Sequence, residues 1–310
     1  MKRMILALCV LLGGHGLIAQ ISMMDISYPA HTQQVTLASG LSIAYVSEGP
    51  VDAPMTLVMV HGLGSNLKCW QKNIAELSGT YRCVALDLPG YGRSGKGDYA
   101  FDIAFFAAAL QEFIQALKLE RVVLVGHSMG AQIAMTAVLQ SPQLAQKLVL
   151  LAPAGFETFT EQERAWFQMV YTAAVLKATT PEQIRKNFEL NFFHFPADAE
   201  FMIKDRLIMR ETPDYEAYCQ MIPRCVMGML HQPVFDKLSQ IEIPVLVIYG
   251  EQDALIPNRI LHKTLTTAEV ALTGTARLPA GQLKWVSATG HFVQWEGAEQ
   301  VNRYLLDFLK

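Results

Sequence analysis

Charge and cysteine are both scarce in this sequence. Only 17% of its 310 residues are charged, the two signs are mixed along the chain, and the formal net charge is −3. This composition excludes a basic stripe for nucleic acid and gives no long-range field to steer an ionic substrate. No pair among the five cysteines has the spacing of metal ligands. Hydrophobic residues, at 51%, are abundant enough for one sizeable core plus an insertion.

The N-terminus carries an apolar run from Met4 to Leu12 that is too short for a comfortable membrane span. Two basic residues precede the run, and small residues suitable for cleavage follow it at Gly14-x-Gly16 or, less well, at Ala19, a pattern typical of an export signal. We therefore predict that residues 1–19 are a signal peptide and that the protein is periplasmic or secreted. An uncleaved anchor and a plain N-terminal helix are the alternatives.

Four cysteines would remain after removal of a signal peptide, an even number that allows disulfides. Cys219 and Cys225 could close a small loop. Cys83 lies in an apolar run and is interpreted as a core residue.

The most informative stretch joins a strand to a helix through a glycine-flanked serine. Val122–Val125 is typical of a buried strand, Gly126-His-Ser-Met-Gly130 follows it, and a helix-compatible segment continues to Gln140. A sharp turn of this kind strains its central residue and demands small neighbours, which the glycines provide. The turn would expose the Ser128 hydroxyl at the carboxyl end of a strand, beside a helix N-terminus that favours negative charge.

This strand, turn and helix resemble the nucleophile elbow of the α/β-hydrolase superfamily, and the resemblance covers almost everything after about Gln34. It implies an α/β fold with a mostly parallel, eight-stranded sheet flanked by helices and a helical cap inserted after the sixth strand. The sequence pattern divides the chain into a hydrolase core at residues 26–155 and 237–310 and a cap at residues 156–236.

An oxyanion hole is implied by the same resemblance. A continuous apolar run from Met55 to Val60 leads into His61-Gly-Leu-Gly-Ser65, and glycines after a buried strand allow close approach of the backbone to a ligand. In the superfamily a His-Gly-x-Gly stretch here supplies half of the oxyanion hole, so the Leu63 and Met129 amides would be the donors. His61 is expected to hold the loop rather than to act as the base.

The acid and base partners of Ser128 are expected after the last two strands. Asp253 stands at the Gly-x-x-Asp position after Pro244–Tyr249, with Glu251 as its rival, and His291 follows the strand at 283–287. Ser128, Asp253 and His291 reproduce the chain order of the superfamily.

Two other acidic positions are interpreted as structural or vacant. Asp87 begins an Asp-x-Pro-Gly-x-Gly-x-Ser loop and is interpreted as its anchor. The loop after the strand at 147–151 has no acid before Glu157, so we expect that position of the triad to be vacant.

The remaining segments are expected to be helical. Core helices are predicted at 66–77 and 101–117 and from Pro257 onwards, with a Gly/Thr-rich loop at 273–276. Within the cap, we predict helices at 161–176, 181–191, 198–210 and 215–229. The cap is rich in aromatic and methionine side chains, which suit an apolar pocket wall. Its polar candidates are His194, His231 and Arg206, and an inward-facing Arg206 would be a carboxylate clamp.

The sequence thus predicts a serine hydrolase that cleaves carboxylic esters of apolar small molecules through an acyl-enzyme, with no metal and no organic cofactor. The tail from Gly290 to Leu309 resembles carbon–carbon hydrolases that act on ring-fission products, although His127 and Phe292 depart from their pattern. Carbon–carbon hydrolysis, cofactor-free perhydrolase or haloperoxidase chemistry, and a non-catalytic binding module remain alternatives. A serine nucleophile disfavours the haloalkane dehalogenase and epoxide hydrolase branches.

Overall fold

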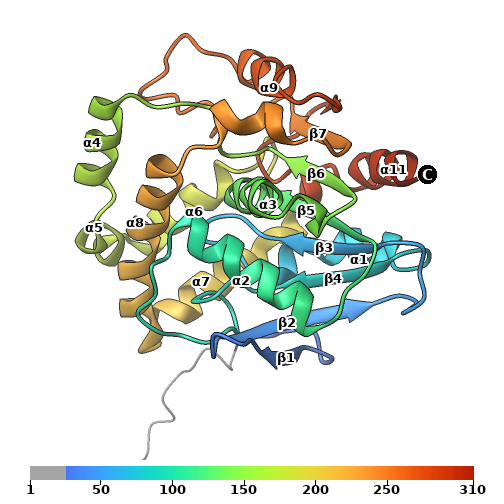
Figure 1. The fold of residues 1–310 in the computed structure, drawn as a ribbon. Helices are drawn as coiled ribbons and strands as arrows, with labels where there is room; N and C mark the ends of the chain where they lie inside the picture. Colours follow the sequence, from blue (N-terminus) through green and yellow to red (C-terminus); the bar gives the residue numbers. More distant parts are fainter. Residues whose placement is uncertain (1–25) are drawn as a thin grey trace, which may run out of the picture.

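A computed structural model describes residues 26–310, which fold around one eight-stranded sheet (Figure 1). The strand order is β1-β2-β4-β3-β5-β6-β7-β8, and β2 is antiparallel to both of its neighbours while every other pair is parallel. The strands are β1 (Gln33–Thr36), β2 (Ser42–Glu48), β3 (Thr56–Val60), β4 (Arg82–Leu86), β5 (Val122–His127), β6 (Lys147–Leu151), β7 (Val245–Gly250) and β8 (Gly281–Val286). The predicted fold class is confirmed.

The predicted signal peptide, residues 1–19, lies outside the described residues, so export stays a prediction. Within the described part of the chain, no helix is both long enough and apolar enough to cross a membrane.

Helices cover both faces of the sheet. The α-helices are α1 (Gln71–Leu77), α2 (Ile103–Ala116), α3 (Met129–Gln140), α4 (Glu161–Val170), α5 (Ala173–Ala178), α6 (Pro181–Glu189), α7 (Glu200–Arg210), α8 (Asp214–His231), α9 (Thr267–Thr275), α10 (Val293–Glu296) and α11 (Ala298–Leu309). Short 3-10 turns are η2 (Leu67–Trp70), η3 (Pro142–Leu144), η4 (Ala197–Ala199) and η5 (Phe235–Gln240). Helices α2, α3 and α9 pack on one face, and α1, α10 and α11 on the other.

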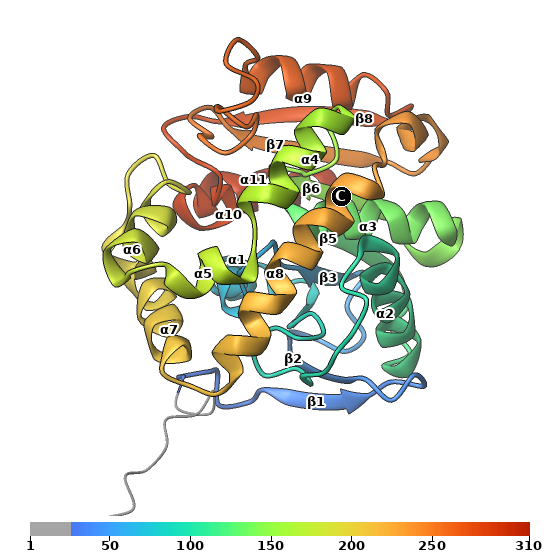
Figure 2. The ribbon, with the colours of Figure 1, turned by 90° about the vertical axis from the view of Figure 1, so that its left-hand side faces the viewer.

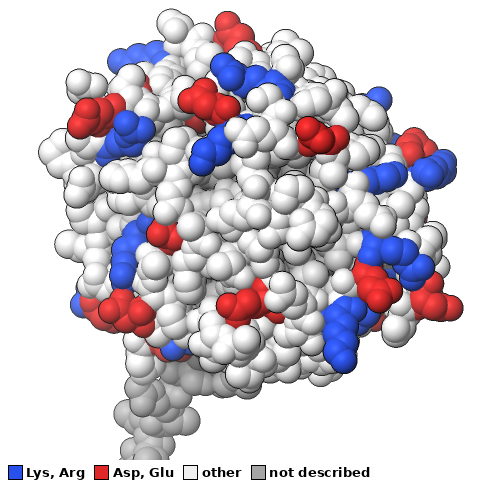
Figure 3. Space-filling view, in the orientation of Figure 1, with Lys and Arg blue, Asp and Glu red and all other residues white. Residues whose placement is uncertain are grey.

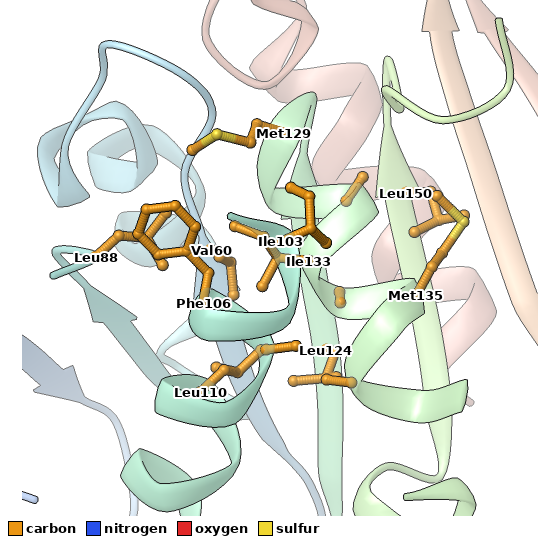
Figure 4. Close-up of a cluster of buried hydrophobic side chains, with 14 of the residues drawn as sticks. Val60, Leu88, Ile103, Phe106, Leu110, Leu124, Met129, Ile133, Met135 and Leu150 are labelled. Carbon is orange, nitrogen blue, oxygen red and sulfur yellow. The ribbon is translucent and has the colours of Figure 1, made fainter. Parts of the chain in front are cut away.

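The central strands read as unbroken apolar runs because both of their faces are buried. On β5, Leu124 belongs to the core cluster under α2 and α3, whereas Val123 and Val125 belong to the opposite cluster. Figure 4 shows Leu124 in the same cluster as Phe106 and Leu110 of α2 and Ile133 of α3. Each such side chain contributes about 1.5–3 kcal/mol when fully buried. This two-sided core fixes the sheet whose carboxyl edge carries the site.

Helices α4–α8 form the cap between β6 and β7, at the left in Figure 1 and facing the viewer in Figure 2. Capping boxes start two of these helices: Thr160 and Glu163 form one on α4, and Thr180 and Gln183 form one on α6. The insertion of a helical cap after the sixth strand is as predicted. The face of the molecule in Figure 3 carries charges of both signs interspersed.

Three predicted helices differ from the structure, and the one predicted at 161–176 is interrupted at Tyr171 and Thr172, between α4 and α5. The helix predicted from Pro257 is wrong, because Asn258 accepts the Ile260 and Leu261 N–H groups in its own turn. A helix forms instead ten residues later, at α9, which runs through the first three residues of the loop predicted at 273–276, and Thr266 caps it. The predicted helix at 66–77 is split into η2 and α1.

The four described cysteines are all free and buried. Cys219 and Cys225 lie six residues apart on α8, which is a rise of about 9 Å. A disulfide needs Cα atoms within roughly 7 Å, so the helix itself keeps this pair from forming one. Cys225 instead contacts the Tyr91 hydroxyl, with 3.3 Å between Sγ and Oη.

Candidate active site

Ser128 sits in a strained turn between β5 and α3. Its φ of 53° and ψ of −118° lie outside the regions that L-residues prefer, a strain of about 1–3 kcal/mol. A Cβ on Gly130 would lie 2.2 Å from the Val60 carbonyl oxygen, and one on Gly126 would lie 2.5 Å from the Ala131 Cα. Only glycine fits at these two positions, so the flanking glycines are what allow the turn to hold Ser128 exposed to the cavity.

Asp253 and His291 form a buried hydrogen-bonded pair. The His291 Nδ1–H donates to Asp253 Oδ2 at 2.8 Å, and the pair is almost completely shielded from solvent. Asp253 Oδ1 accepts the Leu255 and Ile256 N–H groups at 2.8 and 3.0 Å, which fixes the carboxylate. Since Nδ1 is the donor, His291 Nε2 is left as an acceptor. The rival acid Glu251 is exposed to solvent.

The loop after β3 packs directly against the serine turn. A Cβ on Gly62 would lie 3.1 Å from the Ser128 Cβ, and Gly64 has a φ of +68° that favours glycine. Leu63, between these glycines, lines the same cavity as Ser128 and His291. Met129 is the first residue of α3, so its N–H has no hydrogen-bond acceptor within the helix. The two amides predicted for an oxyanion hole therefore lie on the two segments that meet at Ser128.

His61 and Asp87 are hydrogen-bonded to the backbone of this loop. His61 is fully buried, donates from Nδ1 to the Gly62 carbonyl at 2.8 Å, and accepts the Leu88 N–H on Nε2 at 3.1 Å. Burial lowers the pKa of His61, so the ring is neutral in this arrangement. The Asp87 carboxylate accepts the Leu67 and Arg93 N–H groups, both at 2.8 Å.

His127 has a role that the sequence did not reveal. Its Nε2–H donates to the His291 carbonyl at 3.0 Å, and its ring packs against Phe292 with 4.8 Å between centroids. Burial and the neighbouring His291 hold the pKa of His127 well below its usual value. A neutral His127 thus anchors the backbone of His291. In the sequence this residue was only a departure from a family pattern, with no spacing that links it to His291.

The cavity above Ser128 has a volume of about 380 Å³ and a mostly apolar wall. Cap and core both contribute apolar side chains to it: Phe159, Phe167, Val226, Met229, Leu230, Phe235, Leu255, Ile256 and Phe292. Its size is within the range of small-molecule sites.

Glu157 also lines this cavity and was not predicted to have a role. Its carboxylate bonds His262 Nδ1 and accepts the Asn258 N–H at 2.8 Å, while His262 Nε2 bonds Glu163 of α4 at 3.0 Å. Burial raises the pKa of Glu157. Glu157, the acid after β6, is therefore paired with His262 and not with His291. His262 in turn links α4 to the loop after β7.

The three polar cap candidates lie elsewhere. Arg206 lines a smaller adjoining cavity of about 150 Å³ and donates from Nη2 to the Gly64 carbonyl at 2.5 Å. His194 is exposed and packs on Phe193. His231 is exposed at the end of α8.

The tail motif of the sequence attaches the cap to the His291 loop. The Glu296 carboxylate accepts the N–H groups of Gly290, Phe193 and His194, and Trp295 Nε1 donates to Asp198 Oδ1 at 2.9 Å. Trp295 and Glu296 of the tail motif therefore have structural partners within the protein.

Among residues 26–310, no cluster of three or more His, Cys, Asp or Glu side chains is placed to hold a metal ion.

A mostly parallel sheet, a serine in a strained turn after a central strand, an acid and a histidine on later loops, and a helical insertion together define an α/β-hydrolase. The family model described as alpha/beta hydrolase fold matches residues 56–298, and the chain belongs to this family and is a hydrolase.

The chain is similar to curated hydrolases over most of their length. An uncharacterised hydrolase of Bacillus subtilis, YugF, is 30% identical over 82% of this chain and 90% of that protein. A 2-hydroxy-6-oxononadienedioate/2-hydroxy-6-oxononatrienedioate hydrolase of Pseudomonas putida is 27% identical over 90% of this chain and 99% of that protein. The solved structure of a probable hydrolytic enzyme from Pseudomonas aeruginosa superimposes with a TM-score of 0.78 at 23% identity, over 92% of this chain and 96% of that one.

Proposed function

We propose that this hydrolase cleaves carboxylic esters of apolar small molecules with Ser128, His291 and Asp253 as nucleophile, base and orienting acid. The observation that carries the proposal is the Nδ1–Oδ2 bond between His291 and Asp253 beside a strained Ser128, in one apolar cavity. Asp253 selects the tautomer that leaves His291 Nε2 as a proton acceptor.

The reaction would proceed in two halves. As Ser128 Oγ attacks the ester carbonyl carbon, its proton passes to His291 Nε2, and the Leu63 and Met129 amides bond the oxyanion. Collapse of this intermediate breaks the bond to the alcohol, which leaves with the proton from His291. Water then attacks the acyl-enzyme in the same way, and its proton also passes through His291. The acid is released and Ser128 is restored.

The cavity wall supports a neutral, apolar acyl group. Burial of each methylene contributes about 0.8 kcal/mol, a few-fold in specificity per carbon until the cavity is full. The lining also contains Glu157, which is already bonded to His262, and the ionisable side chains of Arg164 and Asp236. A charged acyl group would lose its hydration there, which costs free energy unless a partner replaces it.

A panel of p-nitrophenyl esters of graded acyl length tests the proposal. We expect kcat/KM to rise a few-fold per added carbon from acetate and then to level off or fall once the cavity of about 380 Å³ is full. Equal activity on all chain lengths, or on none, would contradict an apolar acyl site.

Carbon–carbon hydrolysis is a second candidate, supported by the similarity to the Pseudomonas putida hydrolase. A diketo acid substrate would need a cation for its carboxylate, and Arg164 lines the main cavity. Activity on a vinylogous diketo acid distinguishes carbon–carbon hydrolysis from ester hydrolysis. Preference for that substrate over medium-chain esters, lost in Arg164→Ala, would favour the second candidate.

A further inference from the structure

One cationic side chain of the cap reaches the loop that carries Leu63. Arg206 of α7 donates to the Gly64 carbonyl at 2.5 Å. Its guanidinium carbon lies 4.2 Å from the centre of the Tyr218 ring and 5.5 Å from that of Phe188. Since both aromatic residues also belong to the cap, the guanidinium is held by the cap while it bonds the core.

The loop that it bonds is a tight turn. Ser65 donates its N–H to the Gly62 carbonyl at 3.3 Å, so Leu63 and Gly64 occupy the two central positions. Cap atoms lie close to Gly64: a Cβ there would be 3.2 Å from Tyr218 Oη and 3.5 Å from Arg206 Nη2. The Gly64 carbonyl shares a peptide plane with the Ser65 N–H, and the Gly62 carbonyl that accepts this N–H shares a peptide plane with the Leu63 N–H. A rotation of the Gly64 carbonyl would therefore disturb the bond that orients the Leu63 N–H.

The residue before Arg206 bonds the far end of the same loop. Asp205 forms an ion pair with Lys68 of η2, and the Lys68 side chain is only 4% exposed. Lys68 Nζ also donates to the Ser27 carbonyl at 2.8 Å. Two adjacent residues of α7, Asp205 and Arg206, thus bond η2 and the turn that contains Leu63.

We propose that Arg206 is a positioning residue, which holds the Gly62–Ser65 turn so that the Leu63 N–H points at the oxyanion. This inference rests on the proposed function, because the oxyanion hole belongs to that reaction. It also means that the oxyanion hole is complete only while α7 is seated on the core. Arg206 is therefore assigned to the loop and not to a substrate carboxylate.

The test compares Arg206→Ala and Arg206→Lys with Arg210→Ala. Arg210 lies one turn further along α7 and donates to the Thr179 carbonyl within the cap, so it is a matched control. Loss of one oxyanion-hole donor typically lowers kcat about 10²- to 10³-fold. A misaimed donor should cost less, so we expect Arg206→Ala to lower kcat on the best ester roughly 10- to 100-fold with KM changed less than about threefold. Arg206→Lys, which keeps a donor, should lie between Arg206→Ala and wild type, and Arg210→Ala should match wild type.

Two further readouts separate positioning from a general loss of structure. Added guanidinium ion should restore part of the kcat of Arg206→Ala at concentrations that leave wild type unchanged. The rate of phosphonylation by an alkyl fluorophosphonate, which also develops negative charge on oxygen, should fall in parallel with kcat. If Arg206→Ala does not fold, the kcat, KM and labelling rate of Arg206→Lys provide the comparison with wild type and Arg210→Ala.

The outcomes distinguish this inference from the proposed function. Wild-type protein that is phosphonylated on Ser128 supports the function, and equal kcat and equal labelling rate in Arg206→Ala would then overturn the positioning role alone. A rise in KM without a fall in kcat would also overturn it, because it would make Arg206 a substrate-binding residue. Wild-type protein that is not labelled at all would overturn both.

Discussion

At the scale of single residues, the three histidines around Ser128 differ in their hydrogen-bond partners. His291 bonds Asp253 through Nδ1 and lines the cavity. His127 and His61 are buried, and the lowered pKa of each keeps it neutral while it bonds backbone groups of the neighbouring loops. A neutral His127 beside His291 also adds no positive charge that would oppose the His291 imidazolium of the proposed reaction.

The competing acids can be ranked by substitution. Asp253→Asn should lower ester kcat roughly ten-thousand-fold, because an amide favours the wrong tautomer of His291. Glu251→Gln should leave kcat within about twofold of wild type, since the Glu251 side chain is exposed and Asp253 holds His291. Steady-state kinetics on one ester measures both, and the opposite ranking would move the acid to Glu251.

Sequence separation explains which site residues could be predicted. Ser128 and Asp253 each follow a buried strand of apolar residues, and His291 follows the last strand, β8, so local patterns are enough to select these three as candidates. The bonds of His127 to His291, Glu157 to His262 and Arg206 to Gly64 join residues 164, 105 and 142 positions apart. No local pattern marks such pairs, and only the packing of the cap on the core brings them together.

At the scale of elements, the cap is bonded at several separate places to the loops that carry the candidate site residues. Arg206 bonds the loop after β3, His262 joins α4 to the loop after β7, and Glu296 joins residues 193–194 to Gly290. These attachments stay hidden in the sequence because each of the four predicted cap helices is inferred from its own local segment. The same local bias placed a helix at Pro257 instead of at α9.

Glu296 offers a test of this attachment. Glu296→Ala removes a carboxylate that accepts three backbone N–H groups, and we expect a loss of about 2 kcal/mol of stability and of roughly 3–6 °C in Tm. Ester kcat should fall as well, since Gly290 directly precedes His291. Glu299→Ala is the control, because Glu299 is exposed and pairs with Arg303 on α11. Thermal melts in which the two variants behave alike would contradict an anchoring role for Glu296.

At the scale of the whole molecule, the sheet determines where the site can form. The carboxyl ends of β3, β5, β7 and β8 lie at one edge, and the loops leaving them carry Leu63, Ser128, Asp253 and His291. The sheet could be predicted because buried parallel strands have an unmistakable apolar pattern. The shape of the cavity depends on how the cap packs, which periodicity does not determine.

The buried neutral histidines His61 and His127 make the stability of the folded protein depend on pH. In the unfolded chain His61 and His127 take up protons near pH 6.5, whereas the folded protein, with both pKa values lowered, does so only at lower pH. Below about pH 6.5 the unfolded chain therefore binds more protons, and stability falls as the pH falls. Each group can contribute up to about 1.4 kcal/mol per pH unit.

Urea unfolding between pH 7.5 and pH 5.5 measures this response. His127→Asn should reduce the loss of stability on acidification, because asparagine does not titrate in this range. His194→Asn, at an exposed position, should leave the wild-type slope unchanged. A wild-type slope retained in His127→Asn would show that His127 is not kept neutral by the fold.

Turnover of a single medium-chain p-nitrophenyl ester by wild type and Ser128→Ala tests the central claim most directly. Removal of a triad nucleophile typically costs on the order of a million-fold in kcat, so we expect no turnover above background in Ser128→Ala. The circular dichroism spectrum should stay that of the wild type, because the strained turn is held by the surrounding glycines and strands. Ester turnover by Ser128→Ala within about a hundredfold of wild type would contradict the assignment of Ser128 as nucleophile.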